Sequence, residues 1–243
     1  MSDPKKQQYL KVSEADLQGV VRTQFDSPNP TPAQLERRQR SLAHLSQLGV
    51  PFLPSLPVVE DEVAILPRQP EEIAGRCIAI AICAVKGESN DNELVQELTQ
   101  QFDASVLFSP NEKVFIENAH PTQQELIDHA WSYEVLHVLL WSLGYIDALK
   151  PPNELCDVPS DVSTIRDTGG VAGLTKSAEP RSMSELLDAA DLYYHLHWSV
   201  IQLRIEEKSS DGLDESIIRE RHRALNWLIR YLDQKWDYIT TDT

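Results

Sequence analysis

The chain has 243 residues, of which 41% are hydrophobic and 25% charged, and these are ordinary values for a globular protein with a sizeable core. The formal net charge of −16 at pH 7 disfavours nucleic acid as a partner, because an acidic surface repels phosphate backbones, and it favours a basic protein partner. The three cysteines (Cys77, Cys83 and Cys156) have no framework spacing, which argues against a secreted disulfide scaffold.

The sequence predicts no membrane contact. Its longest apolar run, from Cys77 to Val85, is far shorter than the roughly 20 residues that a spanning helix needs. No basic N-terminal stretch leads into an apolar one, so no signal peptide is expected. We therefore expect a cytoplasmic protein.

The first third of the chain predicts a polar arm followed by a helix. Residues 1–30 are polar, and only Tyr9 to Val12 suggest a short extended piece. Thr31 is a suitable N-cap before Pro32, and Gly49 can close the helix that follows.

The proline-rich segment 50–67 should be extended, since proline and the residue before it avoid the helical region. Glu62 to Leu66 could form a short strand. The β content expected here is at most a minor hairpin near the N-terminal third.

Three helical segments are expected next. Pro70 opens an apolar helix that Gly87 should end, and its apolar residues on most faces predict a central position. A second helix is expected from about Asn90 to Phe102, and Ser109 should start a short helical turn.

The middle of the chain predicts one helix and then a long loop. Thr122 and Glu125 have the spacing of a capping box, and the helix should continue to Gly144. Residues 151–181 show little periodicity, so we expect a loop of the length that is usually functional or disordered.

Two helices should complete the chain. Ser182 or Ser184 can cap a helix that reaches about Glu207, and the last helix is expected from about Asp214 to Trp236. Together these elements predict a mainly α fold: a single domain over residues 31–243, built as a bundle-like array of about six to eight helices.

The last predicted helix carries polar residues in an apolar seam. His222 lies in this seam and Asn226 at its edge, and buried His and Asn side chains need hydrogen-bond partners. They either form a core network that fixes helix register or act as a ligand or catalytic group. The heptad-spaced seam residues are Ile218, His222, Leu225, Ile229 and Leu232.

Glu134 is the second anomaly, because its helical neighbours are apolar or aromatic and a buried carboxylate requires a partner. Arg38 or Arg221 could pair with it, either as a structural ion pair or as part of a site. With His137 it forms a Glu-x-x-His pair, of which di-iron bundles use two. A second copy is absent from the sequence, so chance explains this pair better.

Asp191 and His195 lie one helical turn apart and could share a metal ion. They also belong to an ordinary polar stripe, so they are weak metal candidates. No metal site is otherwise predicted, and the sequence does not tell which cofactor, if any, the protein uses.

Several blocks resemble a bacterial family known as domain of unknown function 4272, over roughly residues 35–243. Ser132 stands where this family often has arginine. The resemblance implies one intact domain and carries no activity to transfer. The blocks are Gly49-Val50-Pro51, Trp131-Ser132-Tyr133-Glu134, Leu139-Leu140-Trp141-Ser142-Leu143-Gly144, Cys156-Asp157, Glu220-Arg221-His222-Arg223-Ala224-Leu225-Asn226-Trp227, Trp236-Asp237 and Thr240-Thr241-Asp242-Thr243.

The residues that look anomalous on physical grounds fall in these blocks and could converge in one polar cleft. They are Glu134, Arg221, His222, Asn226 and Asp237.

Three functions remain open. The first is a module that binds a protein or small ligand, including immunity- or antitoxin-like binding to a basic partner. The alternative is an enzyme with a carboxylate and histidine site between helices, such as a metal-dependent hydrolase. The third is a purely structural helical subunit.

Overall fold

The structure is a computed structural model that describes residues 29–210 and 212–243. The expected polar arm over residues 1–30, with its short extended piece at Tyr9 to Val12, lies almost wholly outside these residues. The described residues form helices and no strand, which confirms the mainly α fold. The α-helices are α2 (Pro32–Leu48), α3 (Pro70–Ser89), α4 (Asn92–Gln101), α5 (Pro110–Glu117), α6 (Gln123–Ala130), α7 (Ser132–Ser142), α8 (Val158–Thr168), α9 (Val171–Lys176), α10 (Met183–Ile205) and α11 (Glu215–Leu228).

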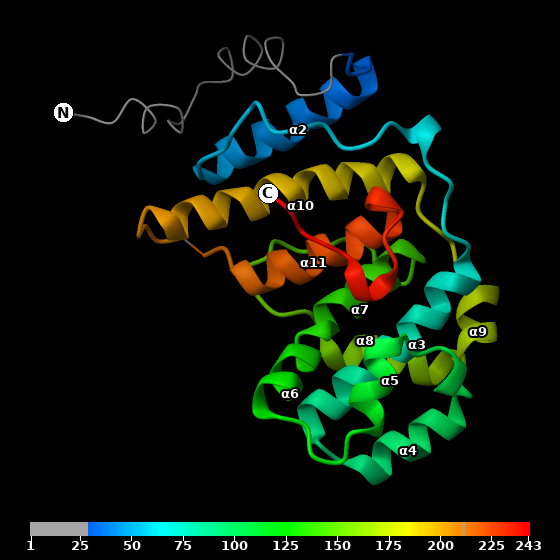
Figure 1. Ribbon diagram of the computed structural model, residues 1–243. Helices are drawn as coiled ribbons and strands as arrows, with labels where there is room; N and C mark the ends of the chain where they lie inside the picture. Colours follow the sequence, from blue (N-terminus) through cyan, green and yellow to red (C-terminus); the bar gives the residue numbers. More distant parts are fainter. Residues whose placement is uncertain (1–28, 211) are drawn as a thin grey trace.

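The helices pack as a stack in which each long helix contacts the next. Figure 1 shows α2 lying on α10, with α11 beyond α10. α11 contacts α7, and α7 contacts α3. α3 is central as predicted: residues 73–84 are all buried, and α4, α5, α6, α8 and α9 surround it.

Local capping signals account for most helix starts. Thr31, Thr122 and Ser182 cap their helices as the sequence predicts, and each forms a capping box with the residue three positions on, a pattern that the sequence predicts for Thr122. Gly49 closes α2 in the left-handed conformation (φ 71°), where glycine meets no steric penalty.

Gly87 does not end α3, which continues to Ser89 before Asn90 closes it. Its role is close packing instead. A Cβ atom at this position would lie 2.5 Å from the backbone nitrogen of Ala130 and 2.6 Å from the carbonyl oxygen of Leu126. Glycine therefore lets the backbone of α6 approach α3.

The helix expected from Thr122 to Gly144 is divided into α6 and α7 at Trp131. The Trp131 N–H donates to the Ile127 carbonyl, whereas the Glu134 N–H donates to the Trp131 carbonyl, three residues back. The tighter turn redirects the chain while Trp131 itself keeps helical angles, so no breaking residue marks it.

The prediction of a long loop over residues 151–181 is wrong, because α8 and α9 lie within it. Each buries little: Asp161 and Ile165 are the buried residues of α8, and Leu174 is that of α9. So few buried positions leave no hydrophobic period to recognise.

The short strand expected from Glu62 to Leu66 is also wrong. Glu62–Ala64 form a 3-10 helix that the Asp61 side chain caps, and Leu66 is exposed. Among the described helices, none is long and apolar enough to cross a membrane.

The last helix ends at Leu228, earlier than the expected Trp236. Arg230 and Leu232 adopt left-handed conformations and turn the chain back, so that Trp236 packs edge-on against Trp227 with ring centres 5.4 Å apart. Leu232 is consequently exposed and does not belong to the apolar seam.

Candidate functional site

Glu134 and Arg221 form a buried ion pair between α7 and α11, which confirms one of the two pairings expected for Glu134. The Arg221 Nε donates to Glu134 Oε2 at 2.8 Å, and both side chains are almost fully buried. The second carboxylate oxygen, Oε1, accepts the backbone N–H of Cys156 at 2.7 Å.

A second nitrogen of the Arg221 guanidinium is hydrogen-bonded as well. Its Nη1 donates to the Lys150 carbonyl at 2.7 Å and to the Tyr193 hydroxyl at 2.9 Å. Burial on its own lowers the pKa of Arg221, but Tyr193 and Glu134 outweigh burial and raise this pKa above its ordinary value. The pair therefore connects α7, α10, α11 and the loop after α7.

His222 faces α10, away from Arg221. Its Nδ1 lies 3.1 Å from Nδ1 of His197, and burial first, then His197, lowers the pKa of His222 to about 3. Asn226, one turn on, donates to the Thr240 carbonyl at 2.9 Å. His222 and Asn226 line a cavity of about 280 Å³ that Tyr194 and the C-terminal residues help to enclose.

Asp237 lies at the N-terminus of α5. One carboxylate oxygen accepts the Ser109 hydroxyl and the other accepts the Asn111 N–H at 3.1 Å. A carboxylate at this position complements the helix dipole. Asp237 also lines a separate cavity of about 230 Å³ with Arg223 and His129.

The five residues expected in one polar cleft therefore occupy three places. Arg221 and His222 are neighbours on α11, but Arg221 bonds Glu134 on α7 whereas His222 bonds His197 on α10. Asn226 accompanies His222, and Asp237 lies apart at α5. That these residues bind a ligand or take part in catalysis remains a prediction.

The two weak metal candidates, Asp191 and His195, lie buried at the interface of α2 and α10. His195 Nε2 is 3.9 Å from Asp191 Oδ2, and Ser41 Oγ donates to the same oxygen at 2.6 Å. Burial lowers the pKa of His195 to about 4, so its ring is neutral near pH 7. Arg38 belongs to this cluster, and burial lowers its pKa against the attraction of Asp191.

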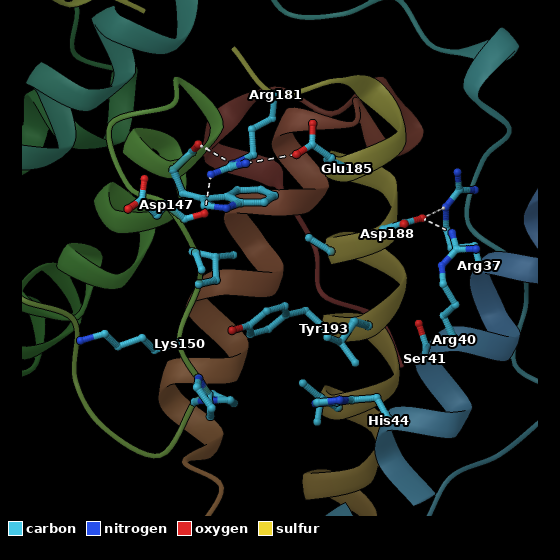
Figure 2. A pocket seen from close by; sticks show the side chains of 18 residues that line it. Arg37, Arg40, Ser41, His44, Asp147, Lys150, Arg181, Glu185, Asp188 and Tyr193 are labelled. Atoms are coloured by element: carbon cyan, nitrogen blue, oxygen red, sulfur yellow. Dashed lines mark hydrogen bonds and ion pairs between the residues drawn. The ribbon is translucent and has the colours of Figure 1, made fainter. Parts of the chain in front are cut away.

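A groove of about 550 Å³ runs along α10, and we call it the α10 groove. Figure 2 shows α2 on one side of α10 and the loop carrying Asp147 and Lys150 on the other. Its apolar surface comes mainly from α10 and from the loop. These residues are Trp141, Ala148, Leu149, Pro151, Pro152, Ala189, Leu192, Tyr193 and Leu196.

Basic side chains gather around the α10 groove. Two of them share one acceptor: Arg37 Nε and Arg40 Nη2 lie 3.0 and 2.7 Å from the same oxygen, Oδ1 of Asp188. The buried Nη1 of Arg37 has no hydrogen-bond partner among the described residues. Four cationic side chains (Arg37, Arg40, Lys150, Arg181) face three carboxylates (Asp147, Glu185, Asp188) in the groove.

Arg181 also lines the α10 groove, and all three nitrogens of its guanidinium have hydrogen-bond partners. Its guanidinium lies over the Trp141 ring, 4.9 Å from the ring centre, and donates to the carbonyls of Trp141, Ile146 and Asp147. It also pairs with Glu185 at 3.1 Å. Arg181 thus holds the loop against α10, as Figure 2 shows.

The sequence analysis missed the α10 groove, although one signal was present. Arg37, Arg40, Ser41 and His44 are spaced so that they share one helix face, and all four line the groove. Asp188, the partner of Arg37 and Arg40, is 151 residues from Arg37 in the sequence. The packing of α2 on α10 brings these residues together.

The family model described as Domain of unknown function (DUF4272) matches residues 37–239. The match includes all the residues that line the α10 groove. Neither the curated proteins nor the solved structures contain a match to this chain.

Proposed function

The chain belongs to the DUF4272 family, and from the geometry of its own residues we propose that it is a binding module whose α10 groove takes a small organic anion with an apolar body. The observation that carries the proposal is the sharing of one Asp188 oxygen by Arg37 and Arg40. A guanidinium normally finds a full set of acceptors when it is buried. A ligand carboxylate or phosphate at the exposed Arg40 would add an acceptor beside the one oxygen that the two arginines share.

Charge supports an anion as the ligand. The chain carries 38 acidic and 22 basic residues, yet the groove has one more basic side chain than acidic ones. Arg40 has a side chain that is 56% exposed, so an incoming anion can reach it. The apolar surface beside it, including Leu192 and Leu196, suits the body of such a ligand.

The side chains of the groove favour binding over catalysis. The Ser41 hydroxyl donates to Asp191, and the Tyr193 hydroxyl accepts from Arg221. Ser41, its carboxylate partner Asp191 and Tyr193 are all buried, so neither hydroxyl is presented to a ligand in the groove together with an exposed general base, as nucleophilic catalysis requires.

The test uses three matched probes: phenylacetate, its neutral amide phenylacetamide, and the cation phenethylamine. Each is titrated into the full chain, and binding is followed by the amide and indole NMR signals. We expect phenylacetate to bind at least about tenfold more tightly than phenylacetamide, because a hydrogen bond to a charged group contributes about 1.5–3 kcal/mol. Phenethylamine should bind most weakly.

Arg40→Gln should remove most of the preference for phenylacetate over phenylacetamide. Arg166→Gln is the matched control, since Arg166 is an exposed arginine on α8 that also pairs with an aspartate, Asp167. Equal affinities for the anion and the amide, or equal effects of the two substitutions, would refute the proposed function.

A basic protein partner is the second candidate, and the net charge of −16 favours it. Binding of a basic protein predicts a complex that dissociates as the salt concentration rises and whose affinity is unchanged by Arg40→Gln. Either candidate suits a cytoplasmic protein, which remains our expectation.

A further inference from the structure

A second cluster of polar side chains lies beside the Glu134–Arg221 pair and includes Cys156, whose backbone N–H bonds Glu134. His137 on α7, Cys156 in the loop before α8 and Asp161 in the first turn of α8 each present one metal-binding atom. These three atoms all lie within 4.8 Å of one another. His137 Nδ1 and Asp161 Oδ2 are 2.9 Å apart.

The donor set fits a divalent cation of the zinc class. Zinc accepts a thiolate, an imidazole and a carboxylate together, whereas calcium and magnesium prefer oxygen atoms only. Tetrahedral zinc places its ligand atoms roughly 3.3–3.8 Å apart. The three atoms can reach that spacing by small side-chain movements.

Neighbouring groups fix the ligands, as outer-shell contacts do in metal sites. Glu134 Oε1 accepts the Cys156 N–H at 2.7 Å, and Arg221 holds Glu134 in place. Glu134 is one turn before His137 on α7, so both residues of the Glu-x-x-His pair belong to this cluster. His137 offers a metal-binding nitrogen, and Glu134 holds the backbone of Cys156.

The cluster also has an approach from outside. His137 and Asp161 are buried, but Cys156 is half-buried and lines a cavity of about 240 Å³. Ile127, Trp131 and Leu155 make the cavity walls apolar. Zinc sites with three protein ligands keep a fourth position for water or substrate, and this cavity supplies the space.

We propose that His137, Cys156 and Asp161 bind one zinc-class divalent cation whose fourth position opens into this cavity. The proposal does not depend on ligand binding in the α10 groove.

Co²⁺ is the first probe, because its absorption reports thiolate ligation and tetrahedral geometry. The full chain, reduced and freed of metal with a chelator, should bind one equivalent and show both the near-ultraviolet thiolate band and the visible bands. Cys156→Ser should abolish the thiolate band. Cys83→Ala is the control, since Cys83 is buried in α3 and should leave the spectrum unchanged.

Zn²⁺ affinity is then measured by competition with a chromophoric chelator. Asp161→Asn should weaken Zn²⁺ binding by more than the roughly 10–100-fold that loss of an outer-shell contact causes. Asp167→Asn, on the same helix and exposed, should have no effect. A thiolate band that survives Cys156→Ser, or equal Zn²⁺ affinity in Asp161→Asn and the unsubstituted chain, would overturn the proposal.

One measurement needs no substitution and therefore no assumption about variant folding. Cys77 and Cys83 are buried, so Cys156 is the accessible thiol of the three in the chain. One equivalent of Zn²⁺ should slow its alkylation by iodoacetamide at least tenfold. An unchanged alkylation rate would contradict the site.

Discussion

Removing either partner of the Glu134–Arg221 pair should lower the free energy of unfolding. The loss should be larger when Arg221 is replaced than when Glu134 is replaced. In Arg221→Met, the Glu134 carboxylate stays buried without a cationic partner and keeps only its contacts with Cys156 among those described above. In Glu134→Gln, the Arg221 cation keeps the Lys150 carbonyl and the Tyr193 hydroxyl. Removing one partner of a buried pair costs about 3–5 kcal/mol. We expect Arg221→Met to fall in that range and Glu134→Gln to lose less.

The double variant separates a stranded charge from lost packing. With Glu134→Gln added to Arg221→Met, no carboxylate is left unpaired, and the amide oxygen can still accept the Cys156 N–H. The double variant should therefore be more stable than Arg221→Met alone by about 1–3 kcal/mol, the cost of leaving a buried polar group without its partner.

Urea unfolding at pH 7, followed by tryptophan fluorescence and far-ultraviolet circular dichroism, measures these differences. Folded proteins are typically stable by about 5–15 kcal/mol. Arg221→Met should therefore either keep a folded baseline at low urea or be close to half unfolded in the absence of urea. A loss below about 1 kcal/mol in Arg221→Met, or strict additivity in the double variant, would refute the view that a buried charge is left unpaired.

Three further outcomes are expected. Burial lowers the pKa of His195 to about 4 from 6.5, so between these pH values the unfolded chain binds a proton that the folded chain does not, and the free energy of unfolding falls as pH falls. His195→Gln should reduce that slope by up to about 1.4 kcal/mol per pH unit in urea unfolding at pH 5 and 6, and an unchanged slope would count against a neutral buried ring. Gly87→Ala should destabilise by about 1–3 kcal/mol in thermal unfolding because its Cβ meets the α6 backbone. The control is Gly75→Ala, whose Cβ would lie 3.4 Å from a movable Leu107 methyl group, and it should be neutral or stabilising by up to about 1 kcal/mol. Equal effects of Gly87→Ala and Gly75→Ala would contradict the close approach of α6. Asp237→Ala should cost about 1–2 kcal/mol and speed amide exchange in α5, whereas exposed Asp167→Ala should not; unaltered exchange in α5 would remove the capping role.

Local signals in the sequence predicted the helices well where the cause is local. Thr31 and Ser182 cap their helices through residues three positions away, so a short window contains the whole signal. α8 and α9 were missed because they bury too few residues to show a period, and their places depend on contacts with α7 and α3.

The same distinction applies to the sites. Glu134 was recognised as a buried carboxylate because its neighbours on α7 are apolar, and the requirement for a partner follows from charge burial alone. Sequence reasoning could not bring Arg37 to Asp188 or His137 to Asp161, because those contacts depend on how distant helices pack. The spacing of Arg37 and Arg40 was visible, but the acceptor they share was not.

The most direct test of the proposed function is a crystal structure of the full chain with phenylacetate. We expect the phenyl ring to lie against Leu192 and Leu196, with the carboxylate within hydrogen-bond distance of Arg40 and directed toward Arg37. Phenylacetate bound elsewhere, or bound in the α10 groove with its carboxylate turned away from both arginines, would contradict the proposed function.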